Sequence, residues 1–554
     1  MLIFLCLSCQ KEPIDPPSEP PTEQPVKTIP PEAVEFLEFE TQTTHSDSLS
    51  LYASDQDKYT SFKSLLNDEE VDLFSSITLR EAGYYELKVN ALTDTDSIDL
   101  YFQFVILDSE RGEAEWGLKK FTPKEIEDKP FALSELDFFY PKKFPKDLSL
   151  PLIFSTNAPK DKWEDYYAHL SIDGHLTTIK RGIGSFLLPP DRSASNLQAI
   201  LYGEIKNLDI IDSEPNYIQL DGTIESNTVL EEEGHYHITS DLTISNSITL
   251  QIPKGCIMKI DEGINIYNNG HIIIQGSATQ PIIFACSESS SHWGGFISIG
   301  AGTSIEVEHA IFTQSGFHDE PPFQYGHAKR QALFYQDKSE LIIRNAYAID
   351  NIGQIFFLLN HSILTLENTL IQRAKTAGDI LGSDLVISDC TFTDFPEYSS
   401  RYVDDDNDCI YLNETDAVIS NSTFMWSKDD GIDSGASGRG EVQVSNCYFE
   451  GIPHEALALS SGGMVTKNHE ISNSVFRNNG QGVELGYSSP NHKVIVTDCH
   501  FEENLIGVRY GDNYNLTVSG HMELIDCSFD ANIDKDIWNF VRSEWSAIDE
   551  NLVF

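Results

Sequence analysis

From about residue 221 onward the chain repeats one pattern of apolar and polar positions. Short alternating runs end in Asn or Asp, a small residue, one variable residue and an aromatic, as in Val386-Ile-Ser-Asp-Cys-Thr-Phe392. From Phe392 the aromatic recurs after 32, 25, 27, 25 and 28 residues. Strands this short cannot bury a face alone, so the period predicts one turn of a β-solenoid whose coils stack on each other.

Two columns of the repeat support this prediction. One holds side chains that tolerate a turn conformation and can hydrogen-bond from coil to coil, namely Asp389, Asn421, Asn446, Asn473, Asp498 and Asp526. The next holds small residues that suit a crowded inward position, namely Cys390, Ser422, Cys447, Ser474, Cys499 and Cys527. Packing therefore explains these cysteines better than disulfides or zinc, since their spacing matches neither.

With these columns, residues 221–554 resemble the right-handed parallel β-helix family, that of pectate-lyase-like and related polysaccharide-acting proteins. The resemblance implies an all-β fold and an extracellular polysaccharide as partner. It is specific for the fold and unspecific for the reaction.

The preceding residues read as two β-sandwich modules. Residues 33–110 show alternating runs typical of an immunoglobulin-like sandwich, such as Ile98-Asp-Leu-Tyr-Phe-Gln-Phe-Val105. Residues 111–220 are β-rich as well. They carry the main basic residues of an acidic chain, namely Lys142, Lys143, Lys146, Lys180 and Arg181. We expect these residues in solvated loops, and the alternative is contact with an acidic glycan or with the C-terminal domain.

The first nine residues are apolar and end in Ser8-Cys9, which looks like the tail of a bacterial lipoprotein signal. Lipidation of Cys9 would anchor the chain, and residues 10–32 then form a proline-rich tether. We therefore expect an outer-membrane lipoprotein, facing the cell surface or the periplasm, with no membrane-spanning helix. The body behind the tether is expected to be monomeric.

Charge excludes one class of function. The chain has 37 basic and 87 acidic residues, a net charge of −50. Nucleic-acid binding needs clustered Lys and Arg, so we exclude it.

The chemistry is expected on a second short strand of each coil. The strands align so that Ile410, Ile432, Leu457, Val483 and Val508 point inward. The next residues then point outward, one per coil: Tyr411, Asp433, Ala458, Glu484 and Arg509. The turns before these strands add more acidic residues and His454.

Three interpretations remain open for this face. Asp433 and Glu484 lie two coils apart, a spacing that suits the two carboxyls of an inverting glycoside hydrolase. A uronic-acid lyase would instead use Ca²⁺ on Asp406, Asp408, Asp430 and Glu455. Its base would be Lys428, His454 or Arg509.

Under the third interpretation the acidic face is solvated and structural. His454 is then a surface hydrogen-bonding residue in a turn, and Arg509 forms an ion pair with Glu484. A non-catalytic glycan-binding protein would use aromatic platforms on the same groove, for which the candidates are Tyr402, Tyr411, Trp426, Tyr487 and Tyr510. An adhesive or structural surface protein would need no groove.

Overall fold

The computed structural model describes an all-β protein. Between residues 48 and 121 it describes seven strands, β1 to β7. From residue 132 to residue 545 it describes the chain except for several gaps. The gaps are 157–167, 174, 191–196, 202–203, 215, 318–330, 396–407, 428, 436–439, 453, 461–466, 487–489, 512–519, 533–534 and 540–543. Cys9, the tether, Tyr402, Asp406, Lys428 and Tyr487 lie outside the described residues. No helix in the described part is long and apolar enough to cross a membrane.

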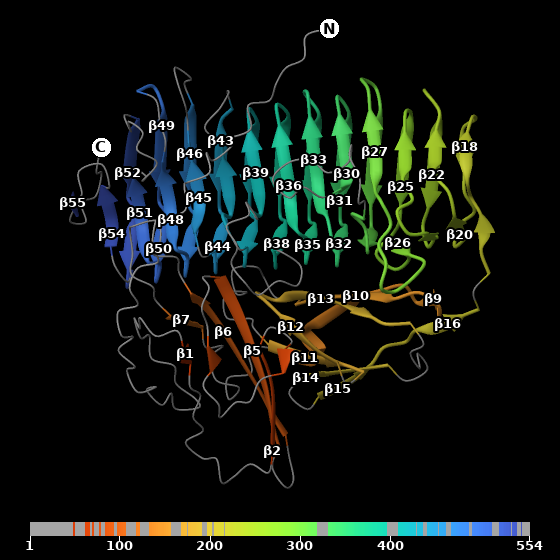
Figure 1. The fold of residues 1–554 in the computed structure, drawn as a ribbon, viewed down its shortest axis with the longest axis horizontal. Helices are drawn as coiled ribbons and strands as arrows, with labels where there is room; N and C mark the ends of the chain where they lie inside the picture. Colours follow the sequence, from red (N-terminus) through yellow and green to blue (C-terminus); the bar gives the residue numbers. More distant parts are fainter. Residues whose placement is uncertain are drawn as a thin grey trace, which may run out of the picture.

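Three parallel sheets wind around one axis and form the predicted parallel β-helix (Figure 1). Sheet 1 has 13 strands, from β17 (Ile218–Gln219) to β53 (Ser528–Asp530). Sheet 2 has 14 strands, from β18 (Gly222–Ile224) to β55 (Glu544–Trp545), and sheet 3 has 12, from β19 (Thr228–Val229) to β52 (His521–Ile525). Along the helix each coil contributes one strand to each sheet and pairs in parallel with the neighbouring coils. The exception is β55, which pairs antiparallel with β54 (Lys535–Asn539) at the end of sheet 2.

The Asn/Asp column forms the turn between sheet 3 and sheet 1. Asp389, Asn421, Asn446 and Asn473 have φ values of 57°, 49°, 53° and 47°, which is the left-handed region. Asn and Asp enter this region at less cost than other residues that carry a Cβ. The backbone N–H of Asn446 donates to the carbonyl of Ser472 in the next coil, so the turn is also tied along the helix axis.

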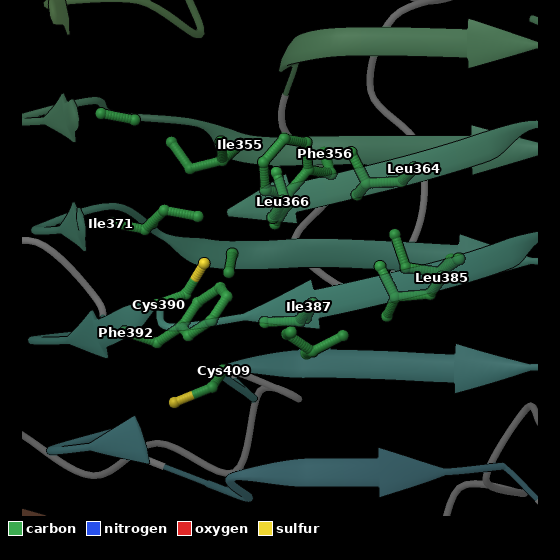
Figure 2. Close-up of a cluster of buried hydrophobic side chains, with 14 of the residues drawn as sticks. Ile355, Phe356, Leu364, Leu366, Ile371, Leu385, Ile387, Cys390, Phe392 and Cys409 are labelled. Atoms are coloured by element: carbon green, nitrogen blue, oxygen red, sulfur yellow. The ribbon is translucent and has the colours of Figure 1, made fainter. Parts of the chain in front are cut away.

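Stacked aromatic rings and the small-residue column fill the interior. The rings of Phe392, Phe424, Phe449, Phe476 and Phe501 stack on each other, with centroids 4.8 to 5.0 Å apart. Figure 2 shows Phe392 beside Cys390 and facing Ile387 in this core. The described cysteines are buried, apart from the half-buried Cys527, which agrees with the packing role predicted for the small-residue column.

The second module packs on the outer face of sheet 1. It has a three-stranded antiparallel sheet of β8 (Leu136–Phe139), β10 (Leu150–Thr156) and β13 (Ile183–Leu188). A four-stranded sheet faces it, made of β11 (Ala168–Ile172), β12 (His175–Ile179), β14 (Gln198–Leu201) and β15 (Glu204–Asn207). Its buried residues share one hydrophobic cluster with Ile257, Ile283, Ile311 and Leu370 of sheet 1.

The first module contributes a five-stranded antiparallel sheet in the order β3-β2-β5-β6-β7, in which β2 spans Ser61–Leu66, β3 spans Glu69–Glu70 and β7 spans Leu118–Phe121. Its long strands are β5 (Gly83–Leu92) and β6 (Ser97–Ile106), which pair along their full length. Antiparallel sheets agree with the expected β-rich modules, whereas an immunoglobulin-like topology stays a prediction.

Candidate functional site

The predicted outward column exists in the expected register on sheet 2. It runs over β39 (Ile410–Asn413), β42 (Ile432–Ser434), β45 (Glu455–Leu459), β48 (Gln481–Leu485) and β51 (Ile506–Tyr510). Tyr411 pairs with Asp433, Asp433 with Ala458, Ala458 with Glu484, and Glu484 with Arg509. The alternate residues Ile432, Leu457 and Val483 are completely buried in the core. The alignment of the coils thus predicted the register correctly, whereas Ala458, Glu484 and Arg509 are buried instead of lying on an open face.

Glu484 and Arg509 form an ion pair across neighbouring coils. Arg509 Nη2 lies 3.1 Å from Glu484 Oε2, and Arg509 Nε donates to the carbonyl of Gly511 at 2.6 Å. Both side chains are buried. An arginine in such a pair holds its charge and is a poor proton acceptor. The same ion pair engages the Glu484 carboxylate.

A second polar cluster lies where sheet 1 strands turn into sheet 2. His454 Nδ1 lies 2.8 Å from Asp430 Oδ1 and 3.1 Å from Asp429 Oδ1, and it also contacts Glu455 Oε2. The Glu455 N–H donates to Asp430 Oδ1 at 2.9 Å. We call Asp429, Asp430, His454 and Glu455 the acidic corner. His454 is buried here, which corrects the expectation of a surface histidine.

Neighbouring coils extend the acidic corner in both directions. The Asp430 N–H donates to Asp408 Oδ1 at 3.2 Å, and Gln481 Nε2 donates to Glu455 Oε1 at 2.6 Å. Three of the four predicted metal ligands, Asp408, Asp430 and Glu455, therefore lie in one connected network.

Burial sets the proton affinity of this corner. Burial is the main cause that raises the pKa of Asp430 to about 6, and repulsion from the Glu455 carboxylate raises it as well. The attraction of His454 lowers this pKa but does not cancel the two other effects. A carboxyl group whose pKa is raised toward neutral pH has the property required of a general acid. Asp433 lies on β42, the strand that follows Asp430, and is only half-buried. Two residues stand between Asp430 and Asp433, so their Cα atoms are at most about 10 Å apart.

Lys467 lies at the other end of the sheet 2 strands. It is buried just before β46 (Asn468–Ser472), and its Nζ donates to the carbonyls of Gly435 at 2.7 Å and Ser460 at 3.0 Å. Burial lowers the pKa of Lys467 to about 8, against the opposing pull of Asp433 and Glu414. Lys467 therefore fixes the ends of two successive strands beside Asp433.

The aromatic candidates divide into accessible and buried rings. Tyr411 is half-buried, and the same column continues upstream through Phe357, Tyr335, Ile297 and the half-buried Tyr267. Asp379 separates Phe357 from Tyr411. Trp426 is completely buried, and the hydroxyl of the buried Tyr510 donates to the carbonyl of Gly520. These two rings offer no open face to a sugar, which corrects their predicted role.

The acidic corner has a donor set that fits a cation. Asp429, Asp430 and His454 each offer one ligand atom, and these atoms lie within 4.8 Å of one another. Such spacing allows ligand distances of about 2.1–2.5 Å to a central ion. A histidine nitrogen among the donors suits a transition-metal dication better than Ca²⁺, which prefers oxygen.

Comparison with protein families agrees with the observed winding. Residues 222–319 match a family described as a pectate-lyase like beta helix domain, and residues 379–551 match one described as a right handed beta helix region. The three stacked sheets and the two matches together identify this part of the chain as a right-handed parallel β-helix, whose first coils are similar to the pectate-lyase like domain. No curated protein matches the chain. The acidic corner and the Asp433 column both lie on the coils of the second match.

The sequence analysis did not name several residues that the structure places at the β-helix site. The alignment of the coils that placed Asp430 and Glu455 in one column also places Gln481 there. The same alignment, continued to the coils before Tyr411, would have placed Tyr335 and Asp379 in the outward column. Lys467 stands in a polar stretch without a repeat signature, so only the folded coil brings it near Asp433.

Proposed function

We propose that the outer face of sheet 2 hydrolyses a polysaccharide that lies along the β-helix axis. The family matches support a polysaccharide-related role. The observation that favours hydrolysis is that Asp430, whose pKa is raised, lies in the turn just before the strand that carries the half-buried Asp433.

In this proposal Asp430 donates its proton to the oxygen of the scissile glycosidic bond. Asp433 removes a proton from the attacking water, which joins the anomeric carbon as the bond to the leaving sugar breaks. Inverting hydrolases place their two carboxyl groups about 6.5–9.5 Å apart, and Cα atoms at most about 10 Å apart are compatible with that spacing. Asp430 replaces Glu484 as the partner of Asp433 in the predicted carboxyl pair, because Arg509 engages Glu484.

The aromatic part of the same column would bind the rest of the chain. Tyr335 is half-buried and its ring stacks with that of Phe357 at 5.7 Å, upstream of Tyr411 and Asp433. The half-buried rings of this column, Tyr267, Tyr335 and Tyr411, can stack on sugar rings of an extended polymer. The net charge of −50 favours neutral over strongly anionic polymers.

A second candidate is a uronic-acid lyase, which the donor set of Asp429, Asp430 and His454 favours. A cation held there, Ca²⁺ or a transition metal, would neutralise the uronate carboxylate. The lyase bases proposed from the sequence are engaged in the described part: His454 by three carboxylates and Arg509 by Glu484. This is why we place hydrolysis first.

The test is to incubate the protein with neutral, sulfated and uronic-acid polysaccharides, with added Ca²⁺ or with chelator. Reducing ends and the ultraviolet absorbance of unsaturated uronates are followed together. Reducing ends alone, insensitive to chelator, are expected for the hydrolase. New absorbance that chelator abolishes would establish the lyase instead, and silence in both channels would point to glycan binding or a structural role.

We further propose that Cys9 carries a lipid anchor that holds this activity at the bacterial outer membrane, with residues 10–32 as tether. The support is the Ser8-Cys9 junction and the eight prolines between Gln10 and Pro31. Metabolic labelling with a fatty acid should mark the wild-type chain and fail with Cys9→Ser.

A further inference from the structure

We infer that Lys180 of the second module is a positioning residue for the acidic corner of the β-helix. The inference rests on the proposed function of that corner and adds a role for the module that precedes the helix. Lys180 and Arg181 form the turn between β12 and β13, and both side chains are buried against the helix, which corrects their expected place in solvated loops.

Lys180 makes two contacts with the turns that lead into sheet 2. Its Nζ lies 2.5 Å from Asp394 Oδ1, and it stands 5.5 Å from the ring centroid of Trp426. The second oxygen of Asp394 accepts from Gln372 Nε2 at 2.8 Å, and Gln372 Oε1 accepts from the Ser185 hydroxyl at 2.6 Å. The cation is thus part of a buried network that joins the module to two coils.

Trp426 transmits this contact to both halves of the acidic corner. It lies three residues before Asp429 in the same turn. In the next coil its ring packs on Gly451 so closely that a Cβ at this position would come within 2.5 Å of the ring. Gly451 lies three residues before His454. A displaced Trp426 ring would therefore shift both turns that bring Asp429, Asp430 and His454 together.

Arg181 contacts the next coil, close to the turn that carries His454. Its guanidinium carbon lies 3.2 Å from the ring centroid of Tyr448, in β44 (Tyr448–Glu450), the strand that leads into Gly451. Two adjacent cations of one turn thus hold successive coils at the point where the acidic corner forms.

The test compares Lys180→Met with Lys259→Met. Lys259 Nζ pairs with Asp147 at 2.8 Å across the same module interface, but on the early strand β23 (Ile257–Ile260). Labelled histidine allows the His454 imidazole signals to be followed by NMR without substrate. We expect Lys180→Met to move these signals and to lower reducing-end release by about 10²-fold, a typical cost of misplacing catalytic groups. Lys259→Met should leave both unchanged.

Two further variants separate positioning from loss of folding. Lys180→Arg keeps the charge and should restore most of the activity. Lys180→Met with Asp394→Asn removes both buried charges, so it should fold with near wild-type thermal stability yet keep the shifted His454 signals. Unmoved His454 signals in both Lys180→Met variants would overturn the inference. If these signals move but wild-type protein cleaves no polysaccharide, the proposed function fails and the positioning contact stands.

Discussion

At the scale of single residues, Asp430 links function to stability. Its pKa of about 6 in the folded chain lies above the ordinary value of 3.8. The stabilising contribution of the protonated form is complete below about pH 4 and is lost as pH rises through 6. Asp430→Asn removes the buried charge and keeps the oxygen that accepts from Glu455. We expect this variant to unfold at higher temperature than wild type at pH 8, with a gain of about 1–3 kcal/mol.

The same comparison at pH 4 supplies the internal control, because there wild-type Asp430 is protonated and the gain should vanish. Asp498→Asn changes an exposed turn residue of the same type and should leave thermal unfolding unchanged at both pH values. If Asp430→Asn is instead less stable than wild type at pH 8, the negative charge of Asp430 is compensated in the folded protein, for example by a bound cation. That result would favour a metal site in the acidic corner.

At the scale of elements, two buried histidines connect coils near the C-terminal end. His469 in β46 accepts the Val442 N–H at 3.0 Å, and its ring centroid lies 5.0 Å from that of His492. Burial and the Lys467 cation lower the pKa of His492 to about 3. A depressed histidine pKa stabilises the fold above about 6.5, and this contribution is lost as pH falls toward 3.

His492→Leu should therefore flatten the acid side of the stability curve. We expect wild type to lose about 2–3 kcal/mol more than the variant between pH 7 and 4.5, at about 1.4 kcal/mol per pH unit. Urea unfolding at these two pH values measures the difference. Parallel losses in both proteins would mean that carboxylates elsewhere dominate acid unfolding.

At the scale of the whole molecule, the sequence predicts what repeats and misses what does not. The period of the aromatics predicted the coils, and the alternation around Ile432 predicted the register of Asp433 and Glu484, because each coil repeats the same local geometry. The burial of Lys180 and Trp426 was not predictable, since it depends on the module docking on sheet 1. The ion pair of Glu484 with Arg509 was one of the alternatives that the sequence predicted. The contact of three carboxylates with His454 could not be predicted, because it depends on the conformation of the two turns that carry these residues.

The central claim is that Asp430 and Asp433 together break a polysaccharide on the face of sheet 2. The most direct measurement is the rate of reducing-end release by Asp430→Asn, Asp433→Asn and the control Asp498→Asn, on whichever polysaccharide the wild type cleaves. Loss of a general acid or base costs about 10²–10⁴-fold, so both site variants should fall by that factor while the control retains the wild-type rate. Full turnover by Asp430→Asn and Asp433→Asn would contradict the account.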